Sequence, residues 1–112
     1  MTQELINNAV FAELCDTMGA DFTAELVTTF LSEAPNMFAA LEQAVADRDA
    51  DAFRRAAHSI KSNAQVFGAN ALGDQARDME LAELTAESAA PVATLQATYD
   101  QTAAALRVLL DE

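Results

Sequence analysis

The feature of this sequence that most restricts its fold is the repeated spacing of apolar residues by three or four positions. The clearest series steps through Phe53, Ala57, Ile60, Ala64 and Phe67, which places one apolar stripe along one side of a helix. Similar series come before and after it, and only 3 glycines and 2 prolines interrupt the 112 residues. Alanine, leucine, glutamate and glutamine lose little on entering a helix. The pattern therefore predicts an all-α fold.

Breaks in this pattern divide the chain into five expected helices. They span roughly residues 4–17, 21–46, 50–66 and 69–86, followed by a last helix that begins after Ser88. Because the connections are short, consecutive helices should run antiparallel. We expect a single domain over residues 1–112, built as an up-down antiparallel four-helix bundle with a short additional N-terminal helix.

A few residues are expected to mark the helix ends. Gly19 should end the first helix as a C-cap, and Asp21 should cap the second. Ser88 should cap the last helix, with proline in its first turn. Pro35 lies inside the second apolar series, so it is expected to kink that helix or split it at Ala34.

The charge balance excludes several function classes. The formal net charge is −12 and the isoelectric point about 4.1, so nucleic acids and anionic membranes should be repelled. No apolar run approaches the roughly 18–20 residues of a membrane helix, and the N-terminus does not resemble a secretory signal. Cys15 is the single cysteine and cannot form an internal disulfide. We expect a free-standing cytoplasmic monomer.

One face of the third expected helix carries the polar residues that could form a reactive site. It carries the single histidine of the chain and half of its six basic residues, as His58, Lys61, Ser62, Gln65, Arg54 and Arg55. A histidine ring is largely neutral and nucleophilic near physiological pH. Phosphoryl transfer needs mainly positioning and charge stabilisation. A solvated face, with the cations paired to Asp47, Asp49 and Asp51, stays open as the commoner arrangement.

The stretch AAHSIKSNAQVFGANALGDQARDME, residues 56–80, resembles the signature of histidine-containing phosphotransfer (HPt) domains. That pattern reads roughly A-H-x-L-K-G-S/N-x-x-x-x-G-A-x-x-L and continues to a leucine-glutamate pair. The matching positions here are Ala57, His58, Ile60, Lys61, Asn63, Gly68, Ala69, Leu72, Met79 and Glu80. Ser62 stands where the family often has glycine, and we expect it to narrow access to the histidine only slightly.

The resemblance implies a role for each matching site residue. His58 would be phosphorylated on Nε2, Lys61 would stabilise the phosphoryl group, and Glu80 on the facing helix would hold Nδ1. Gln65 would line the same surface, and Gly68 would end the helix and keep the neighbouring surface flat. Besides these, Arg54 and Arg55 would assist the approach of an acidic partner.

The resemblance also implies a function in a two-component phosphorelay. The chain would carry a phosphoryl group between response-regulator receiver domains, with a hybrid sensor histidine kinase as a further candidate partner, and without kinase activity of its own. No cofactor is expected on this chain, since Mg²⁺ would belong to the receiver. Exposed apolar residues expected to help docking are Val10, Phe11, Leu14 and Val66. A non-catalytic adaptor that docks receivers is the alternative, and an enzyme with an anion site is a third, weaker one.

Overall fold

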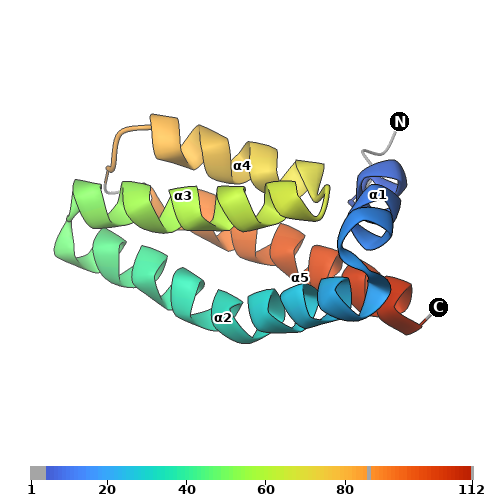
Figure 1. The fold of residues 1–112 in the computed structure, drawn as a ribbon. Coiled ribbons are helices and arrows are strands. Elements are labelled where there is room, and N and C mark those ends of the chain that lie inside the picture. The colour runs from blue at the N-terminus through green and yellow to red at the C-terminus, as the bar shows by residue number, and fades with distance from the viewer. Residues whose placement is uncertain (1–4, 86, 112) are drawn as a thin grey trace.

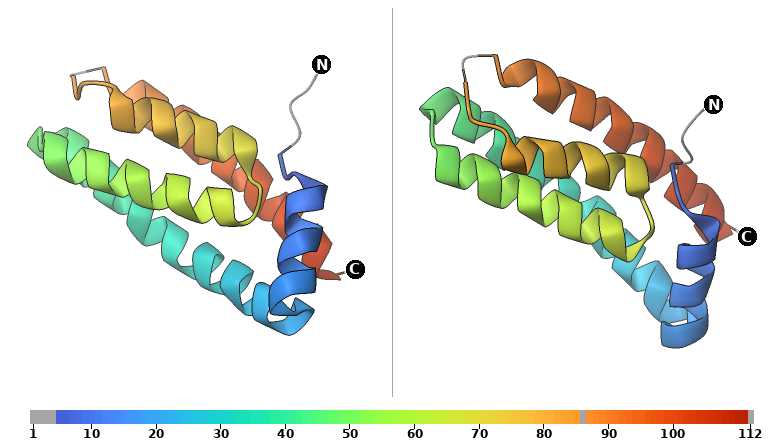
Figure 2. Two further views of the ribbon diagram at one scale, coloured as in Figure 1. Left: turned by 45° about the horizontal axis from the view of Figure 1, so that its top comes forward. Right: turned by 90° about the horizontal axis from the view of Figure 1, so that it is seen from above.

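The computed structural model describes residues 5–85 and 87–111, and these residues form five helices and no strand (Figure 1). The helices are α1 (Asn8–Met18), α2 (Ala20–Asp47), α3 (Ala50–Val66), α4 (Asn70–Leu81) and α5 (Ala89–Asp111). Helices α2 to α5 form the up-down antiparallel bundle, and α1 lies across one end of it, as the two further views also show (Figure 2). The all-α prediction is confirmed.

Two helices begin where a side chain supplies the missing acceptor for the first turn. The Asn7 side chain accepts hydrogen bonds from the backbone N–H groups of Ala9 and Val10, at 3.0 and 3.3 Å, and starts α1. The Asp49 side chain accepts from the N–H of Ala52 at 3.0 Å and starts α3. Such caps satisfy donors that no helical carbonyl can reach. The bounds of α3 agree with those expected from the sequence.

Helix α2 differs from its prediction at its start, and at Pro35 it takes one of the two expected alternatives. It begins at Ala20 after Gly19, so Asp21 lies in its first turn instead of capping it. Pro35 lies inside a helix that is not split, and the ribbon bends near its middle (Figure 1). Proline removes one helical hydrogen bond, and the exposed side of a bundle helix tolerates this as a bend.

The connection between α4 and α5 also differs from the prediction. Helix α4 ends at Leu81 and the chain is extended at Ala82, while the predicted end at residue 86 lies outside the described residues. Leu84 packs against the core from this non-helical segment, so tertiary contact outweighs the helical propensity of the sequence. Ser88 precedes α5 as expected, but its hydroxyl accepts from the N–H of Thr85 at 2.9 Å and not from α5.

The core between the helices consists of the predicted apolar stripes. Its fully buried large side chains include Val27, Leu41, Ile60, Phe67, Leu72, Leu95 and Leu106. Phe30 links α2 to two other parts of the fold, because its ring centroid lies 5.7 Å from that of Phe67 and 5.9 Å from that of Tyr99. These contacts fix the rotation of α3 about its axis, and so decide which of its residues face outward.

Helix α1 is attached to the turn between α3 and α4. The N–H of Asn7 donates to the carbonyl of Gly68 at 2.8 Å. Gly68 has φ +72°, and a Cβ added there would lie 2.9 Å from Cβ of Val10. Glycine is therefore required both by the backbone conformation and by the close approach of α1.

Candidate functional site

Helices α3 and α4 lie side by side and antiparallel over the length of the shorter helix, α4 (Figures 1 and 2). Near their turn the two backbones are close, since a Cβ placed on Gly73 would lie 3.6 Å from Cβ of Ala64. Nearly two turns further along each helix, His58 of α3 faces Glu80 of α4. The site is therefore held by two rigid helices packed on one core.

His58 is exposed but oriented. Its Nδ1 lies 2.8 Å from Oε1 of Glu80, and 56% of its side chain is accessible. An ionised carboxylate can only accept a hydrogen bond, so the neutral ring carries its proton on Nδ1. Nε2 then has a free lone pair, and none of the described residues hydrogen-bonds to it. The arrangement fixes both the tautomer of the neutral ring and the direction of Nε2.

Lys61 is not free beside the histidine; it forms an ion pair with the same glutamate. Its Nζ lies 2.7 Å from Oε2 of Glu80, and the two side chains are only 19% and 18% exposed. The contact with Lys61, followed by that with His58, lowers the pKa of the Glu80 carboxyl below its ordinary value. The carboxylate is thus kept ionised while one of its oxygens faces each of its two neighbours.

The other residues selected from the sequence are not all gathered here. Ser62 is exposed one helical turn from His58. Arg54 is exposed and forms an ion pair with Asp51. Arg55 lies on the α2 side of α3, where it lines a groove with Ser59.

Two supporting residues lie further along the fold. Gln65 is exposed two turns beyond His58, near Gly73 of α4. Gly68 is buried in the turn against α1, so it is a structural residue of the bundle end and does not border His58. The structure shows what this glycine does for the approach of α1, and its expected support of the site stays a prediction.

The predicted docking residues are mostly not available. Phe11 is only 7% exposed and belongs to the core, which corrects the expectation that it is free for a partner. Val10 and Leu14 are partly buried, and Val66 is exposed. Helix α1 uses its apolar side to close the end of the bundle, so this side is occupied.

The sequence reasoning missed two exposed residues of α4 near Glu80. Arg77 lies one turn before Glu80, and Leu81 follows it directly with 78% of its surface accessible. Arg77 and Leu81 are neighbours on the helix surface because they are four residues apart. Leu81 falls outside the apolar stripe of Leu72, Ala76 and Met79, and this departure from the period is the signal that marks it in the sequence.

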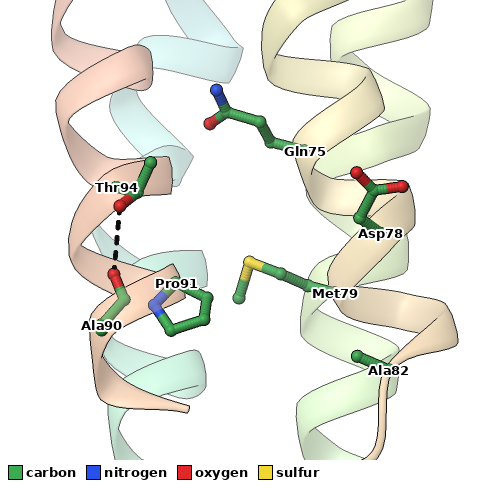
Figure 3. A pocket seen from close by; sticks show the side chains of 7 residues that line it. All are labelled: Gln75, Asp78, Met79, Ala82, Ala90, Pro91 and Thr94. Atoms are coloured by element: carbon green, nitrogen blue, oxygen red, sulfur yellow. Dashed lines mark hydrogen bonds between the residues drawn. The ribbon is translucent and has the colours of Figure 1, made fainter. Parts of the chain in front are cut away.

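The groove between α4 and α5 does not include the site. It has a volume of about 490 Å³ and is lined by Gln75, Asp78, Met79, Ala82, Ala90, Pro91 and Thr94 (Figure 3). His58, Lys61 and Glu80 are not among these residues. No group of three or more metal-ligating side chains occurs in the described ranges 5–85 and 87–111. Over the same residues, no helix is long and apolar enough to cross a membrane.

The comparison with known families agrees with this geometry. The family model described as Hpt domain matches residues 25–107, which cover α3, α4 and most of α2 and α5. The chain therefore belongs to the Hpt domain family, and this membership implies histidine phosphotransfer in phosphorelays. No curated protein and no solved structure matches the chain.

Proposed function

We propose that this chain is a phosphoryl carrier in which His58 takes the phosphoryl group from an aspartyl phosphate of one receiver domain and passes it to the aspartate of another. The observation that carries the proposal is the exposed ring of His58. Its Nδ1 is hydrogen-bonded to Glu80 at 2.8 Å, while Nε2 is accessible to a partner. This is the geometry that an in-line attack by Nε2 requires.

The transfer step can be written on the residues of the site. The lone pair of Nε2 attacks the phosphorus atom, the bond from phosphorus to the aspartyl oxygen breaks, and its electron pair leaves with the aspartate carboxylate. The ring becomes an imidazolium that keeps its proton on Nδ1. Glu80, at 2.8 Å from Nδ1, stabilises this positive charge. Transfer to the second receiver is the reverse of these events.

Lys61 takes part by changing partner. Before transfer its ammonium group is paired with Glu80 at 2.7 Å. The arriving phosphoryl oxygens are a stronger anionic partner on the same surface, one helical turn away. When the ammonium group of Lys61 moves to the phosphoryl oxygens, Glu80 is no longer paired with it, and the full negative charge of Glu80 stabilises the imidazolium. The ion pair thus keeps the site neutral before transfer and supplies both required charges afterwards.

The carrier acts stoichiometrically, without kinase activity of its own. The chain's residues contribute the nucleophile, the carboxylate and the ammonium group, while the receiver contributes the aspartate and the Mg²⁺ that its carboxylates hold. One phosphoryl group per chain is expected, in either direction.

The test is labelling by two phosphoryl donors. The chain is mixed with a phosphorylated receiver domain and Mg²⁺, and separately with phosphoramidate, a small donor that needs no docking. Both should give a phosphoprotein that is labile in acid and stable in alkali. His58→Gln should label with neither donor, and equal labelling of this variant would refute the proposal.

A non-catalytic adaptor gives a different result in the same test. It would bind the receiver, as followed by calorimetry, yet neither donor would label it. The open Nε2 of His58 and the neighbouring ion pair favour the carrier, because an adaptor has no use for an oriented nucleophile.

A further inference from the structure

The charges of the chain are distributed very unevenly among its helices. Helix α2 has five acidic residues and no basic one, whereas α3 has three basic residues against one acidic. The segment 50–81, which contains α3 and α4, has four acidic and four basic residues and is neutral. The whole net charge of −12 therefore belongs to the rest of the chain.

His58 can be approached over either neighbour of α3. On the α2 side lies a groove of about 370 Å³ lined by residues such as Glu33, Met37 and Arg55. On the α4 side lie Arg77 and Leu81. Leu81 is the most exposed large apolar residue of the described chain, at 78%, and it adjoins the residue that holds His58.

The charge of the partner's surface decides between the two sides of α3. If the proposed function holds, the donor surface surrounds an aspartate and the carboxylates that bind Mg²⁺, so it is acidic. Helix α2 has five carboxylates and no cation, so it repels such a surface. On the α3–α4 side, Arg54 and Arg77 are each paired with one acid of their own helix, so that side carries no excess of negative charge and does not repel it. An exposed leucine beside the reacting group also gives the partner an apolar contact to bury.

We propose that receiver domains dock on the α3–α4 face, defined by Arg54, His58, Ser62, Arg77 and Leu81, with Leu81 as the apolar contact and Arg77 as the charged one. This inference rests on the proposed phosphoryl-carrier function and adds the direction from which the partner reaches Nε2. The two residues act on docking and do not touch the reacting atoms.

The experiment separates docking from chemistry by using both donors. Leu81→Ser and Arg77→Glu are compared with the unaltered chain for the initial rate of His58 labelling. The rate from a phosphorylated receiver with Mg²⁺ should fall on the order of tenfold in each variant, as for truncation of an interface contact. The rate from phosphoramidate should stay unchanged, because that donor needs no docking surface.

Matched controls lie at the far end of α5. Val108→Ser removes an apolar side chain that is 59% exposed, and Arg107→Glu reverses an exposed charge. Both should label at the unaltered rate with either donor. Circular dichroism of every variant should show the same helical signal, since all four positions are exposed.

Two results would count against the α3–α4 face, and a third would count against the carrier function on which it rests. Equal receiver-dependent rates in all variants would overturn it. A loss confined to Met37→Glu, in the groove between α2 and α3, would also overturn it and place the partner on the α2 side. If wild-type His58 is labelled by neither donor, the carrier function itself fails. The proposal is supported if the Leu81 and Arg77 variants, but not the control variants, are labelled more slowly by the receiver and at the unaltered rate by phosphoramidate.

Discussion

At the scale of single residues, the site depends on one carboxylate that serves two neighbours. Glu80 lies on the first turn back from the end of α4, with Oε1 toward His58 and Oε2 toward Lys61. Its side chain is 18% exposed, so both interactions are partly shielded from water and are stronger than those of a solvated pair. His58 and Lys61 are therefore coupled through Glu80.

Replacing Glu80 should slow phosphorylation of His58 while leaving the helices intact. Glu80→Gln keeps an oxygen that accepts from Nδ1–H but loses the charge that stabilises the imidazolium, so labelling by phosphoramidate should slow on the order of tenfold. Glu80→Ala loses both and should be slower still. Glu83→Gln, an exposed acid beyond the helix end, is the control. Unchanged rates in both Glu80 variants would show that the carboxylate plays no part in the transfer.

Removing the charge of Lys61 should raise the pKa of Glu80. Lys61→Met keeps the aliphatic stem and removes the ammonium group that contributes most to lowering this pKa. A carboxyl with a lowered pKa stabilises the fold above its ordinary pKa, and this contribution is lost as the pH falls through the folded-state pKa. In Lys61→Met the loss should begin at a higher pH. Carbon-13 NMR titration of the Glu80 carboxyl measures the shift, and an unaltered titration would contradict it.

At the scale of elements, the turn between α3 and α4 connects the site helices to α1. Gly68 is held there with a positive φ and with Val10 and the Asn7 carbonyl at contact distance. The turn determines where α4 begins, and therefore where Glu80 lies opposite α3. Its influence on the site is indirect, through the relative position of two helices.

Gly68→Ala should destabilise the fold without altering the chemistry of His58. The added methyl group meets Cβ of Val10 at 2.9 Å and the carbonyl oxygen of Asn7 at 3.0 Å, and the backbone is strained for alanine. The free energy of unfolding in urea should fall by about 1–3 kcal/mol. Phosphoramidate should label the folded variant at the unaltered rate. Normal stability with slow labelling would instead place Gly68 in the site.

Much of this arrangement could be predicted from the sequence, and the features that could not be predicted all depend on contacts between distant segments. Periodic apolar residues determine α3 to the residue, and the family pattern correctly paired His58 with Glu80. The end of α4, the burial of Phe11 and the ion pair of Lys61 depend on contacts between segments distant in the chain. Spacing within one helix carries no information about such contacts.

At the scale of the whole molecule, repulsion between acidic side chains opposes the folding of a compact bundle. The net charge of −12 is carried by segments other than 50–81, and helix α2 alone has five acids without a basic residue to pair with. Among the described residues, the ion pairs involve only Asp51, Asp78, Glu80 and their partners. Repulsion among the remaining acids should therefore exceed attraction between pairs.

Added salt should therefore stabilise this protein. Raising NaCl from 10 mM to 0.5 M shortens the screening length from about 30 Å to about 4 Å, which weakens repulsion between helices more than it weakens the partly buried pair of Lys61 and Glu80. We expect the melting temperature, followed by circular dichroism, to rise by about 5 °C. Glu25→Gln/Glu42→Gln removes two exposed charges of α2 and should melt higher at low salt, with a smaller rise on adding salt. A melting temperature that falls with salt would mean that attraction within ion pairs outweighs repulsion between acids. The uneven distribution of charge would then affect docking without lowering the stability of the fold.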